Sequence, residues 1–357
     1  MNKSNLTRIV TLIILTASLF GSCKKEDENP PIYIDSDNRV FVTNEGPFQN
    51  GSGSLSVFYR NTLEVYNNIF VGVNGFKLGN LVQSICVHND KVYIVVNNAG
   101  RIEIANKNDL VYKGSIEGIN LPRYFLPVND QKAYVTSWDN KVYVVDLNTN
   151  SVSGEISTAT GPEKMMKVGD EVWVLNQGGL SYDSTITIIN SNDDQVIMNL
   201  VVGDKPSGIV SDKDGFVWVM CSGNGWNGFP GADDSRGKLV CIDPLDHSII
   251  NTHVFPYTDK HPEKLVIDSE GENMFYNYPG GLYSQSIYEE TLEVEPLYAH
   301  ESMFYALGFD PVSSTVFVSD PLDFIQAGIV YRIDAYTGEE LSVFEAGIIP
   351  GEFFFNE

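Results

Sequence analysis

The sequence is poor in basic residues and in cysteine, and both shortages exclude classes of function. Its 357 residues include 23 lysines and arginines but 47 aspartates and glutamates, for a formal net charge of −24. An acidic surface repels nucleic acid, and no basic cluster offsets that repulsion. Beyond Cys23 only Cys86, Cys221 and Cys241 remain, an odd number that does not make a disulfide framework. We expect buried free thiols, with a Cys221–Cys241 bridge as the alternative.

Motifs for catalysis and metal binding are also missing. The histidines have no partner at metal-ligand spacing, and there is no Gly-x-Ser-x-Gly nucleophile elbow. Helical periodicity is nearly absent, so we expect no helix and no phosphate-cradling glycine loop in front of one. The sequence therefore predicts neither a metal site nor a cofactor.

The N-terminus has the features of a bacterial lipoprotein leader. Lys3 and Arg8 precede an apolar run, residues 9–20, that is too short to cross a bilayer comfortably. Two small residues and then Cys23 follow this run, which is typical of a lipobox. We expect a signal peptide at residues 1–22 and a lipid on Cys23, with a plain secretory signal as the alternative.

The linker after the cysteine is short and charged. Residues 23–31 begin Cys-Lys-Lys-Glu-Asp-Glu, a run that resembles the surface-export tag of Bacteroidota lipoproteins. Charged runs of this kind stay solvated and unstructured. We therefore predict an outer-membrane protein that is anchored by its lipid, faces the cell exterior and has a single folded domain at residues 32–357.

A unit of about 40 to 56 residues repeats along the chain. Its clearest copy has apolar runs at 122–126, 132–136, 141–146 and 153–156, separated by turns and a loop. β-Branched and aromatic residues alternate in these runs, as strands require. Four short strands per unit indicate a β-propeller. A proline marks the first strand of most units: Pro122, Pro162, Pro206, Pro262 and Pro350.

The number of first strands predicts seven blades. The first unit has no first strand of its own, because it starts with the second-strand run Arg39–Val42. The C-terminal run Pro350–Phe355 is, in contrast, a first strand with no unit after it. We expect this run to complete blade one and close the ring, since closure removes the open edges at which sheets aggregate. The predicted fold is an all-β, seven-bladed propeller with four-stranded blades.

Strand connectivity divides the loops between two faces. Turns between strands one and two, and between three and four, share one face, which we name the turn face. The remaining loops share the other, which we name the loop face. The turn face is rich in Asp, Asn and Gly, which turn chemistry and solvation explain. The loop face has longer loops with aromatic residues, and long loops on a rigid scaffold are where function concentrates.

A set of side chains on the loop face forms the predicted ligand site. Trp173 and Trp218 lie within strands and are assigned to the core, whereas Trp138 and Trp226 lie in loops. Aromatic rings would stack on a ligand, and amide and basic groups would orient its polar atoms. The alternative is that these rings pack over the blade ends. The predicted set is Asn97, Arg123, Tyr124, Trp138, Lys164, Asn176, Gln177, Tyr182, Trp226, Tyr278 and Tyr305.

With these features the chain resembles the YncE-like seven-bladed propeller lipoproteins of Bacteroidota. The most specific part is the opening, with Asn44-Glu45-Gly46, Gly53-Ser54-Leu55-Ser56 and Gly79-Asn80-Leu81-Val82-Gln83-Ser84. The resemblance covers essentially the whole mature chain. It implies a surface protein beside a TonB-dependent outer-membrane transporter, as in the corrinoid-capturing BtuG proteins.

Three functions fit these observations. The first is a non-enzymatic surface binder that passes a corrinoid, a metal chelate or a glycan to such a transporter. The second is a propeller lyase or hydrolase acting on a glycan or lactone. Its carboxylates would be Glu163, Glu263 and Glu352, which recur at one blade position where they could converge near the axis. The third is a structural or adhesive protein that binds another protein.

Overall fold

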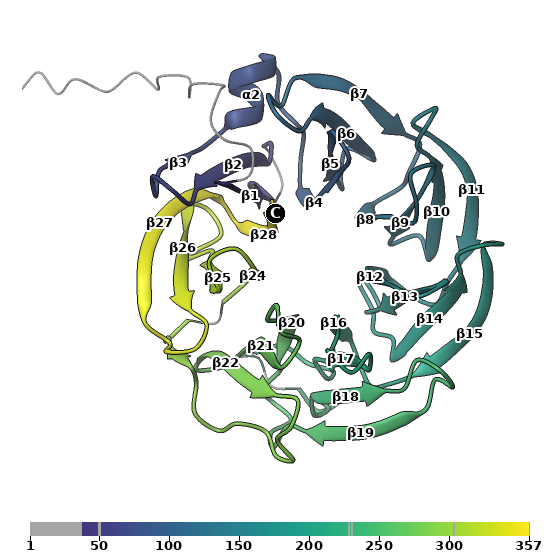
Figure 1. Ribbon diagram of the computed structural model, residues 1–357, viewed down its shortest axis with the longest axis vertical. Coiled ribbons are helices and arrows are strands. Elements are labelled where there is room, and N and C mark those ends of the chain that lie inside the picture. Colours follow the sequence, from purple (N-terminus) through teal and green to yellow (C-terminus); the bar gives the residue numbers. More distant parts are fainter. Residues whose placement is uncertain (1–37, 49–50, 228, 230, 303, 357) are drawn as a thin grey trace, which may run out of the picture. The chain divides into compact units, whose positions relative to one another are not determined.

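This computed structural model describes residues 38–356, apart from 49, 50, 228, 230 and 303. The expected signal peptide, the linker and Cys23 lie outside the described residues. Seven four-stranded antiparallel sheets follow one another around a central axis (Figure 1). This arrangement confirms the predicted all-β, seven-bladed propeller.

The four strands of each blade follow one another from the axis outward. Blade 1 contains β28 (Pro350–Phe355), β1 (Arg39–Asn44), β2 (Ser54–Tyr59) and β3 (Val65–Tyr66). Blade 2 contains β4 (Val82–His88), β5 (Lys91–Val96), β6 (Arg101–Asn106) and β7 (Tyr112–Glu117). Blade 3 contains β8 (Pro122–Pro127), β9 (Lys132–Ser137), β10 (Lys141–Asp146) and β11 (Ser151–Ser157). Blade 4 contains β12 (Pro162–Val168), β13 (Glu171–Asn176), β14 (Thr185–Asn190) and β15 (Gln195–Val201).

The remaining three blades have the same order. Blade 5 contains β16 (Pro206–Ser211), β17 (Val217–Cys221), β18 (Lys238–Ile242) and β19 (Ile249–Val254). Blade 6 contains β20 (Glu263–Ile267), β21 (Asn273–Tyr278), β22 (Gly281–Ser286) and β23 (Tyr298–Ala299). Blade 7 contains β24 (Leu307–Asp310), β25 (Thr315–Asp320), β26 (Ala327–Asp334) and β27 (Glu340–Ile348).

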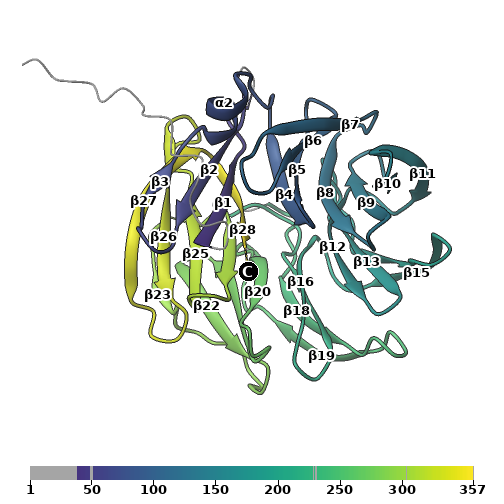
Figure 2. The ribbon, with the colours of Figure 1, turned by 45° about the horizontal axis from the view of Figure 1, so that its top comes forward.

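The C-terminal strand closes the ring, as the sequence predicts. β28 pairs antiparallel with β1, with Phe353 opposite Val42, and Figure 2 shows the last strand beside the first. Phe353 is 8% exposed, and its ring centroid lies 5.7 Å from that of Phe317 in blade 7. The last strand therefore joins the first blade to the seventh through both backbone pairing and side-chain packing.

The core lies between neighbouring blades. Each second strand is buried on both faces, because it lies inside its own sheet and beneath the next blade. Trp173 packs between blades 4 and 5 and Trp218 between blades 5 and 6, which confirms their assignment to the core. Cys221 and Cys241 are free thiols in these same two clusters, on opposite faces of blade 5. The two cysteines are therefore not bridged.

Two local expectations are wrong. A short helix, α2 (Ile69–Asn74), follows the two-residue strand β3, and Ile69 and Phe70 bury themselves in the core between blades 1 and 2. Within the described chain, no helix has the length and apolar character to span a membrane. The sequence predicts longer loops on the loop face, yet the connection after Tyr278 is a tight turn in which Tyr278 pairs directly with Gly281. Gly280 and Gly281 allow this turn, because they take positive φ values of 116° and 141°.

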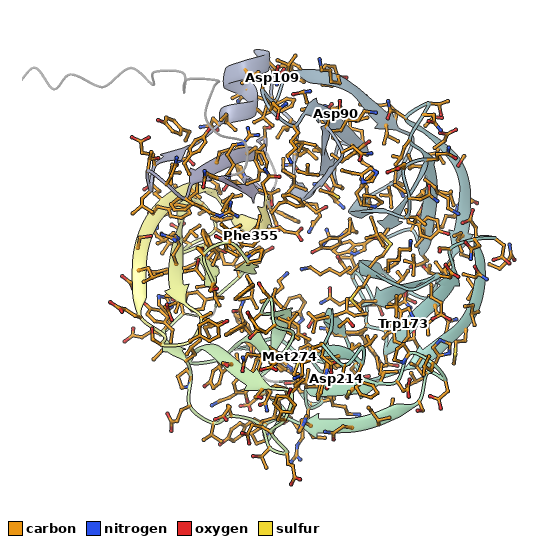
Figure 3. All side chains as sticks on the ribbon, viewed as in Figure 1. Asp90, Asp109, Trp173, Asp214, Met274 and Phe355 are labelled. Carbon is orange, nitrogen blue, oxygen red and sulfur yellow. The ribbon has the colours of Figure 1, made fainter. Side chains whose placement is uncertain are left out.

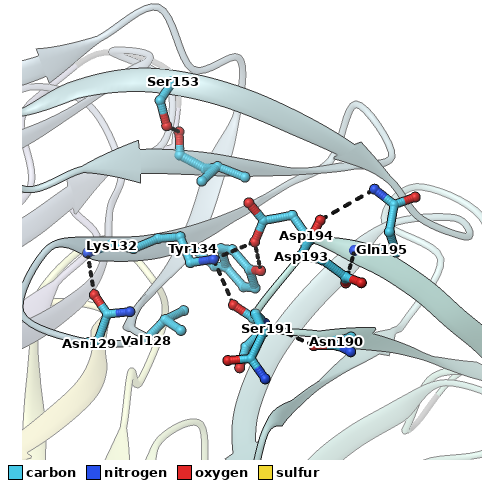
Figure 4. A network of polar contacts seen from close by, with 12 residues as sticks. Val128, Asn129, Lys132, Tyr134, Ser153, Asn190, Ser191, Asp193, Asp194 and Gln195 are labelled. Carbon is cyan, nitrogen blue, oxygen red and sulfur yellow. Dashed lines mark hydrogen bonds and ion pairs between the residues drawn. The ribbon is translucent and has the colours of Figure 1, made fainter.

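The turn face holds polar contacts that join the blades, so solvation alone does not explain its charge. Figure 4 shows one such network, in which the Lys132 ammonium donates to Asp194 at 2.6 Å and to the Ser191 carbonyl at 2.7 Å. The Tyr134 hydroxyl also donates to Asp194. Similar contacts join every other neighbouring pair: Arg39 with Lys107, His88 with Asp130, His247 with Glu171, Lys213 with Glu272, Tyr336 with Glu270, and Arg60 with Asp310.

Candidate functional site

The inner strands are irregular at a recurring position near their loop-face ends. Pairing with the second strand skips two residues near the start of β8, β12 and β20, and one residue in β4, β16 and β28. A β-bulge of this kind bends the strand and re-aims its side chains. The skipped residues include Arg123, Tyr124, Lys164 and Lys264. Bulges thus present charged and aromatic groups at the mouth of the central opening.

We name this group of side chains the axial rim. It is built from the bulges and the residues beside them, from the residues just after two second strands, and from Tyr305 just before β24. Its members are Glu45, Arg123, Tyr124, Trp138, Glu163, Lys164, Glu263, Lys264, Tyr305 and Glu352.

One side of the rim is a fixed three-residue cluster. Arg123 donates through Nε to both carboxylate oxygens of Glu163, at 3.0 and 3.1 Å. The Trp138 indole donates to the same carboxylate at 2.6 Å, and the guanidinium lies 4.1 Å from the centre of the indole. Charge-assisted bonds and cation–π contact hold all three side chains in place. Trp138 is therefore part of a built rim rather than a loose ring over a blade end.

An ion pair crosses the axis itself. Lys164 belongs to blade 4 and Glu352 to blade 1, yet their charged atoms are 3.7 Å apart, and the side chains are only 24% and 18% exposed. Burial raises the pKa of Glu352, although Lys164 opposes this. Burial likewise lowers the pKa of Lys164, although Glu352 opposes this. Both shifts favour the neutral forms, because a pair at this distance does not fully replace the lost hydration.

The opposite side of the rim combines a bound and an unbound charge. The Tyr305 hydroxyl donates to Glu45 at 2.8 Å, and burial raises the pKa of Glu45 in spite of that bond. Lys264 has a positive φ of 62° in the β20 bulge, and its ammonium lies 5.9 Å from the Tyr305 ring centre. A non-glycine residue such as Lys264 keeps a backbone conformation with positive φ only where its surroundings impose it. Burial also raises the pKa of the adjacent Glu263.

A cavity of about 400 Å³ extends from the rim along the axis. Figure 3 shows side chains directed toward this central region, with Phe355 among those closest to it. Tyr124, Lys164 and Glu352 line its rim end, and most of the remaining wall is apolar. The size falls within the usual range for small-molecule sites.

The structure brings five of the predicted ligand residues to this rim: Arg123, Tyr124, Trp138, Lys164 and Tyr305. Two others lie in exposed loops away from the cavity wall. Tyr182 is 59% exposed in the loop after β13, and Trp226 is 72% exposed in the loop after β17, with the Lys205 ammonium 4.7 Å from its ring centre. Gln177 is half-buried, and its backbone N–H donates to the Gly161 carbonyl.

Three predicted ligand residues are buried within the fold, and we leave them out of the site. Asn97 donates to the Pro122 carbonyl of the next blade at 2.9 Å. Asn176 donates to the hydroxyl groups of two threonines in its own blade. Tyr278 packs with Phe255 and Tyr283 in the core between blades 5 and 6. These strand-end amide groups serve the blade structure, because buried polar groups need partners.

Sequence reasoning left Glu45 and Lys264 out of the ligand set and considered Glu163, Glu263 and Glu352 only for catalysis. All five belong to the rim. The available signal was the recurrence of a charged residue one or two positions after four of the five first-strand prolines, Pro206 being the exception. Glu45 lies at the end of a second strand and carries no such signal.

Comparison with known proteins places the chain in a family. Residues 38–346 match a family described as a domain of unknown function, DUF5074. The chain belongs to this family. No curated protein matches it. The matched range of this DUF5074 protein includes strands of all seven blades, ends within β27 and leaves out β28.

Solved structures share the fold at low sequence identity. A quinoprotein alcohol dehydrogenase-like protein from Bacteroides thetaiotaomicron is 16% identical, with a TM-score of 0.65 over 90% of this chain and 79% of that one. The extracellular domain of a protein described as a one-component system from the same organism is 15% identical. Its TM-score is 0.59, over 80% of this chain and 38% of that one. A computationally designed protein, Ika8, is 14% identical, with a TM-score of 0.59 over 91% of this chain and 89% of that one. These likenesses establish the propeller fold, and the finer YncE-like resemblance stays a prediction.

Proposed function

We propose that this protein is a non-enzymatic binding protein that holds a small ligand at the axial rim. The observation that carries the proposal is the Lys164–Glu352 pair, which spans the opening above a cavity of about 400 Å³. A structural ion pair needs no cavity beneath it, and a rigid polar rim over a concave, mostly apolar wall is typical of ligand sites. Buried ion pairs contribute little net stability, so the position of this pair is better explained by recognition.

A thermal-shift screen tests the binding proposal. The panel contains the predicted ligand classes, namely corrinoids, metal chelates and glycans, together with small carboxylates and amines. A ligand at 100 times its dissociation constant adds about 2.7 kcal/mol to the free energy of unfolding. With about 0.7 kcal/mol/K of unfolding entropy for a domain of this size, the melting temperature should rise by about 4 °C. Lys164→Met should remove the shift, and a shift that survives this change would place the site elsewhere.

Surface capture and delivery extend the proposal. Cys23 would anchor the protein in the outer membrane, and the rim would pass its ligand to a TonB-dependent transporter, as the YncE-like resemblance implies. The leader sequence and the extracellular Bacteroides neighbour support this location. Cys23→Ser should release the protein from the membrane fraction, and protease added to intact cells should degrade the wild type. Protection from that protease would contradict a surface location.

An enzymatic function is the second candidate, because two of the three predicted carboxylates form ion pairs at the axial rim, where Glu163 pairs with Arg123 and Glu352 with Lys164. Burial raises the pKa of Glu352 and of Glu263. A carboxyl group with a raised pKa suits general acid chemistry. Turnover of a glycan or lactone that is lost in Glu263→Gln, with the melting temperature not lowered, would establish the enzyme. Binding of the same compound without turnover would favour the binding protein.

A further inference from the structure

The axial cavity is amphipathic along its length. Apart from Ser84, Tyr124, Lys164, Gly308 and Glu352, the residues that line it are hydrophobic side chains or the thiol of Cys86. The four polar side chains, Ser84, Tyr124, Lys164 and Glu352, lie toward the rim, where the inner strands begin. The Ser84 hydroxyl already donates to the Arg123 carbonyl at 2.7 Å. A ligand in this cavity would therefore meet polar side chains at one end and mostly hydrophobic residues along the rest.

The size and lining of the cavity narrow the ligand class. A volume of about 400 Å³ lies near the lower end of the range of about 300–1,000 Å³ that is typical of small-molecule sites. A corrinoid is far larger than this. A sugar would place several of its hydroxyl groups against the hydrophobic side chains, and each unpaired buried hydroxyl is costly. A single hydrocarbon chain fits both the volume and the lining.

The charges at the rim indicate the sign of the head group. Glu163 is already paired with Arg123 and Trp138, and Glu45 with Tyr305. Lys264 makes no ion pair with any residue that the structure describes, and the only ion pair of Lys164 there is the 3.7 Å contact with Glu352. Lys164 and Lys264 both lie in the bulges near the start of their inner strands, β12 and β20. Burial lowers the pKa of Lys164, and the charge of Lys264 acts in the same direction.

We propose that the axial cavity binds a medium-chain monocarboxylate, with the carboxylate between Lys164 and Lys264 and the chain in the apolar part of the cavity. This inference rests on the proposed function and names its ligand class. A carboxylate would relieve the repulsion between the two lysines through charge-assisted hydrogen bonds. Glu352 fits this arrangement, because burial raises its pKa and its Oε2 has no hydrogen-bond partner in the described structure. Its protonated carboxyl group can donate to the carboxylate of the ligand.

The test measures binding of defined alkyl probes to the purified protein by calorimetry. Sodium octanoate, decanoate and dodecanoate report on chain length, and dodecylamine reports on head-group charge. The dissociation constant should fall about fourfold for each added methylene, which corresponds to about 0.8 kcal/mol. Dodecylamine should bind at least tenfold more weakly than dodecanoate, since it would meet two lysines. Equal binding of the amine, or affinity independent of chain length, would overturn the proposal.

Variants separate the head-group site from the chain site. Lys164→Met and Lys264→Met should each weaken dodecanoate binding at least tenfold, because hydrogen bonds to charged groups contribute about 1.5–3 kcal/mol. The matched control is Lys113→Met, which makes the same change on the outer strand β7 and should leave affinity within twofold. Met165→Trp should fill part of the cavity and weaken dodecanoate more than octanoate. If that variant does not fold, the two lysine variants still decide the outcome.

The results also separate this inference from the function on which it rests. One outcome is that no alkyl probe binds but another panel ligand does, and that Lys164→Met abolishes this binding. The proposal of a monocarboxylate ligand is then wrong, and the proposal of a ligand site at the axial rim is supported. If dodecanoate binds with unchanged affinity in Lys164→Met, Lys264→Met and Met165→Trp, the axial location is wrong for this ligand. If rim variants affect no ligand at all, both proposals fail.

Discussion

Deleting residues 350–357 should prevent the protein from reaching its native state. The deletion removes β28, which pairs with the inner edge of β1, and with it Phe353, Phe354 and Phe355. Truncating a buried phenylalanine to alanine costs about 3–5 kcal/mol. Phe353 is buried, and the partly buried Phe354 and Phe355 add to its loss before any backbone hydrogen bond is counted. A typical domain is stable by only about 5–15 kcal/mol in total. We therefore expect an open ring that is unfolded or aggregated at 37 °C.

A single substitution provides a milder form of the same perturbation. Phe353→Ala should cost about 3–5 kcal/mol. With about 2.1 cal/mol/K of unfolding entropy per residue over about 320 residues, this lowers the melting temperature by about 4–7 °C. Phe48→Ala is the matched control, because Phe48 is exposed on the loop face and should change the melting temperature by less than about 1 °C.

The assay is thermal unfolding followed by circular dichroism, with gel filtration to detect aggregates. If the truncated chain elutes as a monomer and melts within about 2 °C of the full chain, β28 is not needed for closure. That result would refute the reasoning that the C-terminal strand closes the first blade. Phe353→Ala could melt at the wild-type temperature while the truncated chain fails to fold. In that case the stabilising effect of β28 would come from its backbone pairing with β1 rather than from the Phe353 side chain.

Three further predictions concern the turn face and the rim. Asp310→Ala leaves the buried Arg60 guanidinium without its carboxylate and should cost about 3–5 kcal/mol in urea unfolding; a loss below about 1 kcal/mol would make the pair a weak surface contact. Trp138→Ala should weaken binding of any axial ligand about tenfold or more in calorimetry, whereas Trp226→Ala should not, and the reverse order would move the site to the loops. Burial raises the pKa of Glu263 above 4.5, so its ionised form destabilises the fold above the folded-state pKa. Glu263→Gln should therefore raise the melting temperature at about pH 8, with the gain vanishing below about pH 4.5; a gain that persists in acid would exclude titration as its cause.

The predicted ligand set shows where sequence reasoning reaches its limit. Asn97, Asn176 and Tyr278 have the composition of a binding surface, yet the fold uses them for hydrogen bonding between strands and for core packing. Residue type and loop position do not distinguish these two uses, because both need a polar or aromatic group at the end of a strand. Only burial and partner atoms decide between them.

The sequence by itself determined the blade count, the strand order and the closing strand. These follow from local alternation and from the period of the repeat, which each blade carries within its own residues. Tertiary structure alone decided the site. Lys164 and Glu352 are 188 positions apart in the numbering and come from non-adjacent blades, so their contact depends on the diameter of the closed ring. The bulges that direct side chains to the axis likewise depend on how each inner strand pairs with its neighbour, which no single strand encodes.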